Sequence, residues 1–130
     1  MKKLFELWKR RKALKYFLYV EDHHEHINDL CKMLDNEKIN NYTMTSRGLR
    51  DHTLECALAI LTYSQRDLIN CYGLKDSVIL IEQATQLASI GRCLFESNTV
   101  GLQSIKLVGA IREVVMKMQR IVSSKKVNVL

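Results

Sequence analysis

Histidines and carboxylates are the residues of this chain best suited to chemistry, and they are concentrated in one short stretch. Residues 21–26 read EDHHEH, which places three imidazoles among three carboxylates within two helical turns. On a helix, His23 with His26 (i, i+3) and Asp22 with His26 (i, i+4) could share a divalent cation. A structural zinc site needs four converging ligands, usually from more than one element, and the sequence assigns no further ligand. We therefore predict a solvated face here, with no bound metal and no cofactor.

His52 and Cys56 form a second pair of chemical interest, since four residues separate them and a helix would bring them to one face. A thiol beside an imidazole acts as a nucleophile only in a cleft with an oxyanion site. The sequence signals neither of these features, and it contains no nucleotide-binding glycine loop and no marked pair of acid–base carboxylates. We predict a packed cysteine next to a surface histidine, and a protein that is not an enzyme and has no catalytic residues.

The net charge of the chain comes from its first residues. The 130 residues include 20 Lys and Arg against 14 Asp and Glu, for a formal net charge of +6. Residues 1–15 contain seven cations and one carboxylate, so this segment carries the whole net charge and the remainder is neutral. We call residues 1–16 the arm. Its cations are Lys2, Lys3, Lys9, Arg10, Arg11, Lys12 and Lys15.

A local cluster of cations favours a polyanionic partner for the arm. Phe5, Trp8 and Tyr16 stand among the lysines. Such aromatic side chains could stack on bases, lie among lipid headgroups or dock in a protein groove. A charged run can also be no more than a solvated face, and that alternative stays open. The arm therefore predicts contact with nucleic acid or with an anionic membrane surface.

The elements that must position these residues are predicted to be helices. The chain contains no proline and five glycines, which leaves few obligatory turns, and it has no Asn-Gly or Asp-Gly hairpin signal. Breaks in the hydrophobic pattern give four helices, near residues 3–35, 46–72, 75–97 and 99–123. We predict an all-α protein: a four-helix bundle over residues 17–124 with a long, basic N-terminal helix that includes the arm, and a short tail at 125–130.

The first and last helices have the most informative apolar patterns. The first would be about 50 Å long and longer than the others, so its basic half should project beyond the bundle or pack on a neighbour. Four leucines between residues 4 and 18 converge on one side of it, although Arg11 and Lys15 interrupt them. The last helix carries one continuous apolar stripe, which should lie at the centre of the packing: Leu107, Val108, Ile111, Val114, Val115, Met118, Ile121 and Val122.

The four cysteines and the hydropathy pattern bear on the compartment. Cys31, Cys56, Cys71 and Cys93 show no CxxC spacing and are predicted to be reduced thiols packed in helices. The lysines and arginines of the arm interrupt any signal-peptide core, and no apolar run approaches the roughly 20 residues that cross a bilayer. We expect a cytoplasmic protein that is soluble or peripheral to a membrane.

Short segments of the central and last helices resemble a known family. They are Arg47-Gly48-Leu49, Leu54-Glu55-Cys56-Ala57-Leu58 and Leu107-Val108-Gly109-Ala110-Ile111. Over about residues 46–124 the chain is similar to the small four-helix-bundle family of the accessory variability determinant of diversity-generating retroelements and of the proteins encoded in ribosomal RNA intervening sequences. The resemblance implies a non-enzymatic bundle, often assembled as a five-fold ring, whose basic surface binds RNA and a reverse transcriptase.

Two functions follow as hypotheses. The first is an accessory helical bundle that binds RNA or DNA and a partner protein, a reverse transcriptase if the resemblance holds, and that assembles into homo-oligomers. The alternative is a peripheral membrane or protein–protein adaptor that lays its basic helix on an anionic membrane. The residues predicted to contact the anionic partner are the seven cations of the arm together with Arg47, Arg50, Arg112, Lys117 and Arg120; Arg92 is a further cation of the similar region.

Overall fold

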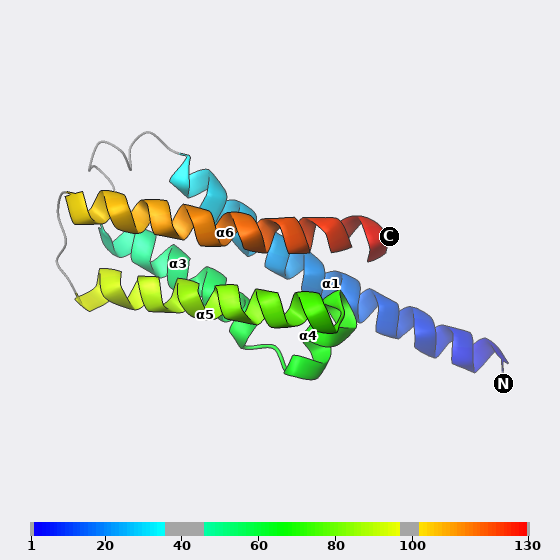
Figure 1. The fold of residues 1–130 in the computed structure, drawn as a ribbon. Helices are drawn as coiled ribbons and strands as arrows, with labels where there is room; N and C mark the ends of the chain where they lie inside the picture. Colours follow the sequence, from blue (N-terminus) through cyan, green and yellow to red (C-terminus); the bar gives the residue numbers. More distant parts are fainter. Residues whose placement is uncertain (1, 36–45, 97–101, 130) are drawn as a thin grey trace.

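The computed structural model of this protein describes residues 2–35, 46–96 and 102–129. Every element within these ranges is an α-helix, and none of the residues described lies in a β-strand, so the predicted all-α fold is confirmed for them. In chain order (Figure 1), the helices are α1 (Lys2–Leu34), α3 (Ser46–Leu61), α4 (Gln65–Tyr72), α5 (Leu74–Glu96) and α6 (Leu102–Val129).

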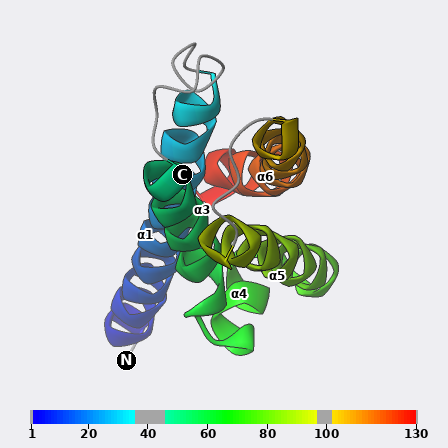
Figure 2. The same ribbon diagram turned by 90° about the vertical axis from the view of Figure 1, so that its left-hand side faces the viewer.

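Four long helices pack around a shared core. Helix α1 contacts α3 and α6, and α5 contacts the same two helices from the other side, as the end view in Figure 2 shows. The short helix α4 packs against α5 and α1 at one end of this assembly. The buried side chains from all five helices form one continuous apolar cluster, whose largest members are Tyr72, Ile27, Leu30, Leu34, Ile60, Leu68, Leu80, Leu87, Ile111 and Met118.

The second predicted helix, residues 46–72, is divided into α3 and α4. Helix α3 ends at Leu61. At Ser64 the backbone is extended (φ −66°, ψ 152°), and its side chain accepts a hydrogen bond of 3.1 Å from the backbone N–H of Asp67. This is an N-cap, which satisfies a helix-end donor and allows a new helix to begin. Gly73 then ends α4 with φ +86°, a positive-φ conformation that glycine adopts without steric cost.

The apolar stripe of the last helix lies where it was predicted. Five of its eight residues are buried and the other three are half-buried against the core. Helix α6 continues to Val129, through most of the segment that was predicted as a tail. The stripe therefore runs along the centre of the assembly, between α1 and α5.

Helix α1 is long and only partly covered. It has 33 residues, and its N-terminal half extends past the ends of the other helices (Figure 1). Its buried residues begin at Val20 and recur at His23, Ile27, Leu30 and Leu34. No described helix has an apolar stretch long enough to cross a membrane. The arm is therefore a helical projection from a packed body, by which we mean residues 20–34 of α1 together with α3–α6.

Candidate nucleic-acid interface

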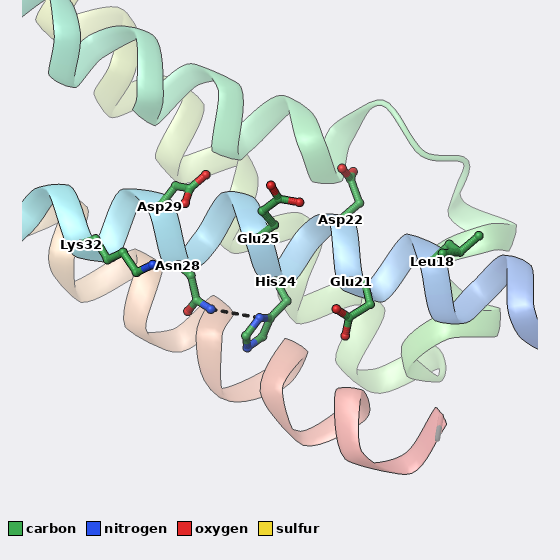
Figure 3. A pocket seen from close by; sticks show the side chains of 8 residues that line it. All are labelled: Leu18, Glu21, Asp22, His24, Glu25, Asn28, Asp29 and Lys32. Atoms are coloured by element: carbon green, nitrogen blue, oxygen red, sulfur yellow. Dashed lines mark hydrogen bonds between the residues drawn. The ribbon is translucent and has the colours of Figure 1, made fainter.

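The three histidines of residues 21–26 each have a different partner. The His23 ring is buried and its Nδ1 lies 2.6 Å from the Tyr72 hydroxyl. His24 shares a hydrogen bond of 3.0 Å with the Asn28 amide, drawn in Figure 3, whereas His26 pairs at 3.5 Å with Asp22 near the surface. Among the residues described, no three His, Cys, Asp or Glu side chains converge on a point where a metal ion could be held.

Within the described ranges, His23 is part of the packed core and not of a metal site. Its ring meets the Tyr63 ring edge-on with 4.6 Å between centroids, and it lies 5.8 Å from the Tyr72 ring. Burial lowers the pKa of His23 from 6.5 to about 4, because the protonated ring would lose its hydration. The imidazole is therefore neutral at physiological pH, and its hydrogen bond to Tyr72 joins α1 to α4.

Cys56 lacks the properties of a nucleophile. Its side chain is buried, and burial raises the pKa of its thiol to about 12, so the thiol stays protonated at neutral pH. His52, one turn earlier, is exposed. The pair is thus a packed cysteine near a surface histidine, as the sequence predicted. Cys31 and Cys71, like Cys56, are free thiols.

The arm carries its cations over aromatic rings. Lys9 Nζ lies 4.8 Å from the centroid of the Phe5 ring, and Lys12 Nζ lies 5.1 Å from the Trp8 ring. The Phe5 and Trp8 rings stack on each other with 6.1 Å between centroids. Each contact joins residues three or four positions apart, the spacing that brings side chains together on a helix. The arm thus presents cations and flat aromatic surfaces side by side.

A basic groove lies where the arm meets the body. Trp8, Arg11, Lys12, Lys15 and Tyr16 of α1 line one wall, and Ser64, Arg66 and Asp67 at the start of α4 line the other. The amide of Asn70 donates a hydrogen bond of 2.9 Å to the Tyr16 hydroxyl, which fixes α4 against α1. The N-cap at Ser64 starts α4 beside the arm, and this is why Arg66 faces the arm's cations.

The electrostatics of this basic groove favour an anion. Arg11, Lys12, Lys15 and Arg66 contribute four positive charges against the single carboxylate of Asp67. The neighbouring Tyr19 side chain and the Asp67 carboxylate raise the pKa of Lys15 above its usual value of 10.5. The amino end of α4 adds the positive end of its helix dipole to the same wall. The groove therefore combines positive charge with the rings of Trp8 and Tyr16.

The other predicted cations lie away from this groove. Arg50 pairs with the adjacent Asp51 at 3.1 Å. Arg112 donates a hydrogen bond of 2.7 Å to the carbonyl oxygen of Leu34 and lies 3.6 Å from Asp35, so it caps the carboxyl end of α1. Two more cations, Lys117 and Arg120, are exposed on α6. The side chain of Arg47 lies outside the described part of the chain.

Three of the seven predicted cations of the arm, Arg11, Lys12 and Lys15, line the groove, but the prediction missed the wall opposite them. The prediction included neither Ser64 nor Arg66. The pattern Ser64-Gln65-Arg66-Asp67, in which a hydroxyl residue precedes an acidic residue by three positions, is typical of a helix start and could have revealed both.

Comparison with known proteins identifies no relative: no protein-family model, curated protein or solved structure matches the chain. The resemblance to the retroelement accessory family therefore stays a prediction based on the short segments quoted above.

Proposed function

We propose that this protein is a non-enzymatic, nucleic-acid-binding accessory protein. In this proposal the four long helices form a four-helix bundle that serves as a scaffold, and the arm and α4 together bind a single strand of RNA or DNA. The observation that carries the proposal is the basic groove, where four cations from two helices lie beside Trp8 and Tyr16.

Each group in the basic groove has a role in the proposed complex. The guanidinium groups of Arg11 and Arg66 and the ammonium groups of Lys12 and Lys15 neutralise successive phosphates, and each contact releases counterions. The exposed Trp8 ring offers a base a stacking surface, and such stacking is worth about 1–3 kcal/mol per base. Charge and stacking both act on features common to all sequences, so we expect affinity with little sequence preference.

Trp8 provides a direct assay because it is the only tryptophan of the chain. Titration with a single-stranded oligonucleotide should quench its fluorescence if a base stacks on the ring. The double variant Lys15→Gln/Arg66→Gln removes one cation from each wall of the groove, and it should weaken binding and reduce the slope of log K against log salt by about two units.

A matched control distinguishes the basic groove from charge in general. Lys117→Gln/Arg120→Gln removes the same charge from exposed positions on α6, and it should leave the affinity near that of the parent protein. If both double variants lost affinity equally, nucleic acid would be attracted only by the net charge of the protein. If both bound as tightly as the parent, the groove would not be the binding site.

The alternative function, attachment to an anionic membrane surface, is favoured by a different observation. Leu4, Phe5, Leu7, Trp8, Leu14 and Leu18 all remain exposed, and basic helices with such residues lie in membrane interfaces. Co-sedimentation with phosphatidylserine vesicles tests it. The membrane function would replace our proposal if the protein bound these vesicles, if Trp8→Ala weakened that binding, and if the protein did not bind oligonucleotides.

A further inference from the structure

One face of α1 has apolar residues at heptad spacing in the arm and polar residues at the same spacing in the body. Its positions are separated alternately by three and four residues, the spacing that forms a seam between two paired helices. We call this the outer face. It consists of Leu4, Leu7, Arg11, Leu14, Leu18, Glu21, Glu25, Asn28 and Lys32.

The apolar part of the outer face is not covered by the protein's own body. Leu4, Leu7, Leu14 and Leu18 are 50–73% exposed. At 100° per residue they lie about 180° around the helix axis from the buried residues Val20, Ile27 and Leu34. Because α1 is continuous through both regions, the contacts that bury one side hold the other side toward solvent.

The two halves of the outer face carry opposite charge. Arg11 and Lys15 flank the leucines in the arm, whereas the half within the body is surrounded by carboxylates. Figure 3 shows these acidic side chains along α1, where they and Leu18 line a shallow hollow: Glu21, Asp22, Glu25 and Asp29. A partner of complementary charge is therefore acidic where it meets the arm and basic where it meets the body half of α1.

We propose that this partner is a second copy of the chain, with the two α1 helices packed antiparallel through their outer faces. The arm of each copy then lies along the acidic half of the other. In the register that brings Leu14 of one copy against Leu18 of the other, Arg11 falls beside the acidic half of its partner's helix. A parallel arrangement would instead bring Arg11 against Arg11 and carboxylate against carboxylate.

An anionic membrane fits the outer face less well than a second copy does. A flat surface that covers the whole helix would contact Glu25 and Asp29 as well as the leucines, and anionic lipids repel those carboxylates. The antiparallel pair turns the same carboxylates into attractive partners for the arm. Arg11 belongs to both the outer face and the basic groove. The proposal still does not rest on the nucleic-acid function, because the leucines that form its seam, Leu14 and Leu18, do not line the groove.

The dimensions of the pair predict a modest affinity. A strip about 50 Å long and about 10 Å wide on each copy gives an interface on the order of 1,000 Å² in total. This size lies at the lower end of specific interfaces, and a dissociation constant in the micromolar range is the corresponding expectation.

Sedimentation equilibrium of the full chain tests the association. We expect a reversible change from 15.1 kDa to about twice that mass over about 1–100 µM. The double variant Leu14→Asp/Leu18→Asp should raise the dissociation constant at least about 100-fold, because each leucine pair of the seam would become two carboxylates that face each other. The matched control Leu58→Asp/Leu74→Asp changes two leucines of similar exposure outside the outer face, and it should leave the dimer intact.

The orientation is tested by carbodiimide cross-linking of mixed ¹⁴N- and ¹⁵N-labelled protein. Mixed-label links from lysines of the arm to Glu25 or Asp29 support the antiparallel pair. A single 15.1 kDa species throughout the concentration range, or equal dissociation of the two double variants, would overturn the proposal. So would a monomer that binds phosphatidylserine vesicles through Leu14 and Leu18, since the leucines would then face lipid.

Discussion

The two halves of α1 belong to one uninterrupted helix, but they differ in how far their apolar residues are buried. From Val20 to Leu34 the helix buries a residue in nearly every turn against α3, α4 and α6. From Leu4 to Leu18 it carries equally large apolar residues, and these stay exposed. The difference is one of direction, since the two apolar sets lie on opposite sides of the same axis.

This comparison shows how a rigid helix can hold a basic segment away from the core. The body half fixes the axis of α1 through packing and through the hydrogen bond between His23 and Tyr72. The arm then extends from that axis with its cations and rings already placed, so a partner need not order it. The free energy of unfolding should therefore depend on the body half of α1, and the affinity for a partner should depend on the arm.

The largest difference in the free energy of unfolding is expected between two Leu→Ala variants, one in each half of α1. Leu30→Ala removes a fully buried side chain and should lower the free energy of unfolding by about 2–5 kcal/mol. Leu14→Ala, at a residue that is 56% exposed, should change it by no more than about 0.5 kcal/mol. Urea denaturation at low protein concentration measures both values. Equal losses would mean that the arm packs on the body.

A smaller effect is expected from pH, and it should arise in the body half alone. The pKa of His23 is about 4 in the folded protein and 6.5 in the unfolded chain, so the unfolded chain takes up the proton first as the pH falls. The stabilisation is complete above pH 6.5 and is lost as the pH falls through about 4, a change of about 3 kcal/mol.

Urea denaturation between pH 7 and pH 4 measures this dependence. His23→Gln removes the titrating group and should flatten the curve over that interval. If the parent protein and the variant depend on pH equally, the His23 imidazole is not a source of the acid sensitivity.

Much of the fold was predictable because helical periodicity and composition are local properties of the sequence. The apolar stripe of α6 was identified from spacing and residue type. The division between α3 and α4 was missed because apolar residues continue at helical spacing on either side of residues 62–64, and that continuity outweighed the cap pattern beginning at Ser64.

The candidate site was predictable only in part. Charge counting located the cations of the arm, because net charge needs no coordinates. The contribution of Arg66 depends on the direction in which α4 leaves its N-cap, and that direction is set by tertiary contacts such as the hydrogen bond between Asn70 and Tyr16. Likewise, the sequence grouped His23 with His26, whereas packing buries one and leaves the other near the surface.

The most direct test of the separation between arm and body measures stability and binding on one variant. Lys9→Gln/Arg10→Gln/Arg11→Gln/Lys12→Gln alters the arm while leaving every buried residue in place. We expect a free energy of unfolding within about 0.5 kcal/mol of the parent, together with weaker binding of a single-stranded oligonucleotide and a salt slope reduced by about one unit per lost phosphate contact. A variant that is equally stable and binds the oligonucleotide as tightly as the parent, with the same salt slope, would contradict the account.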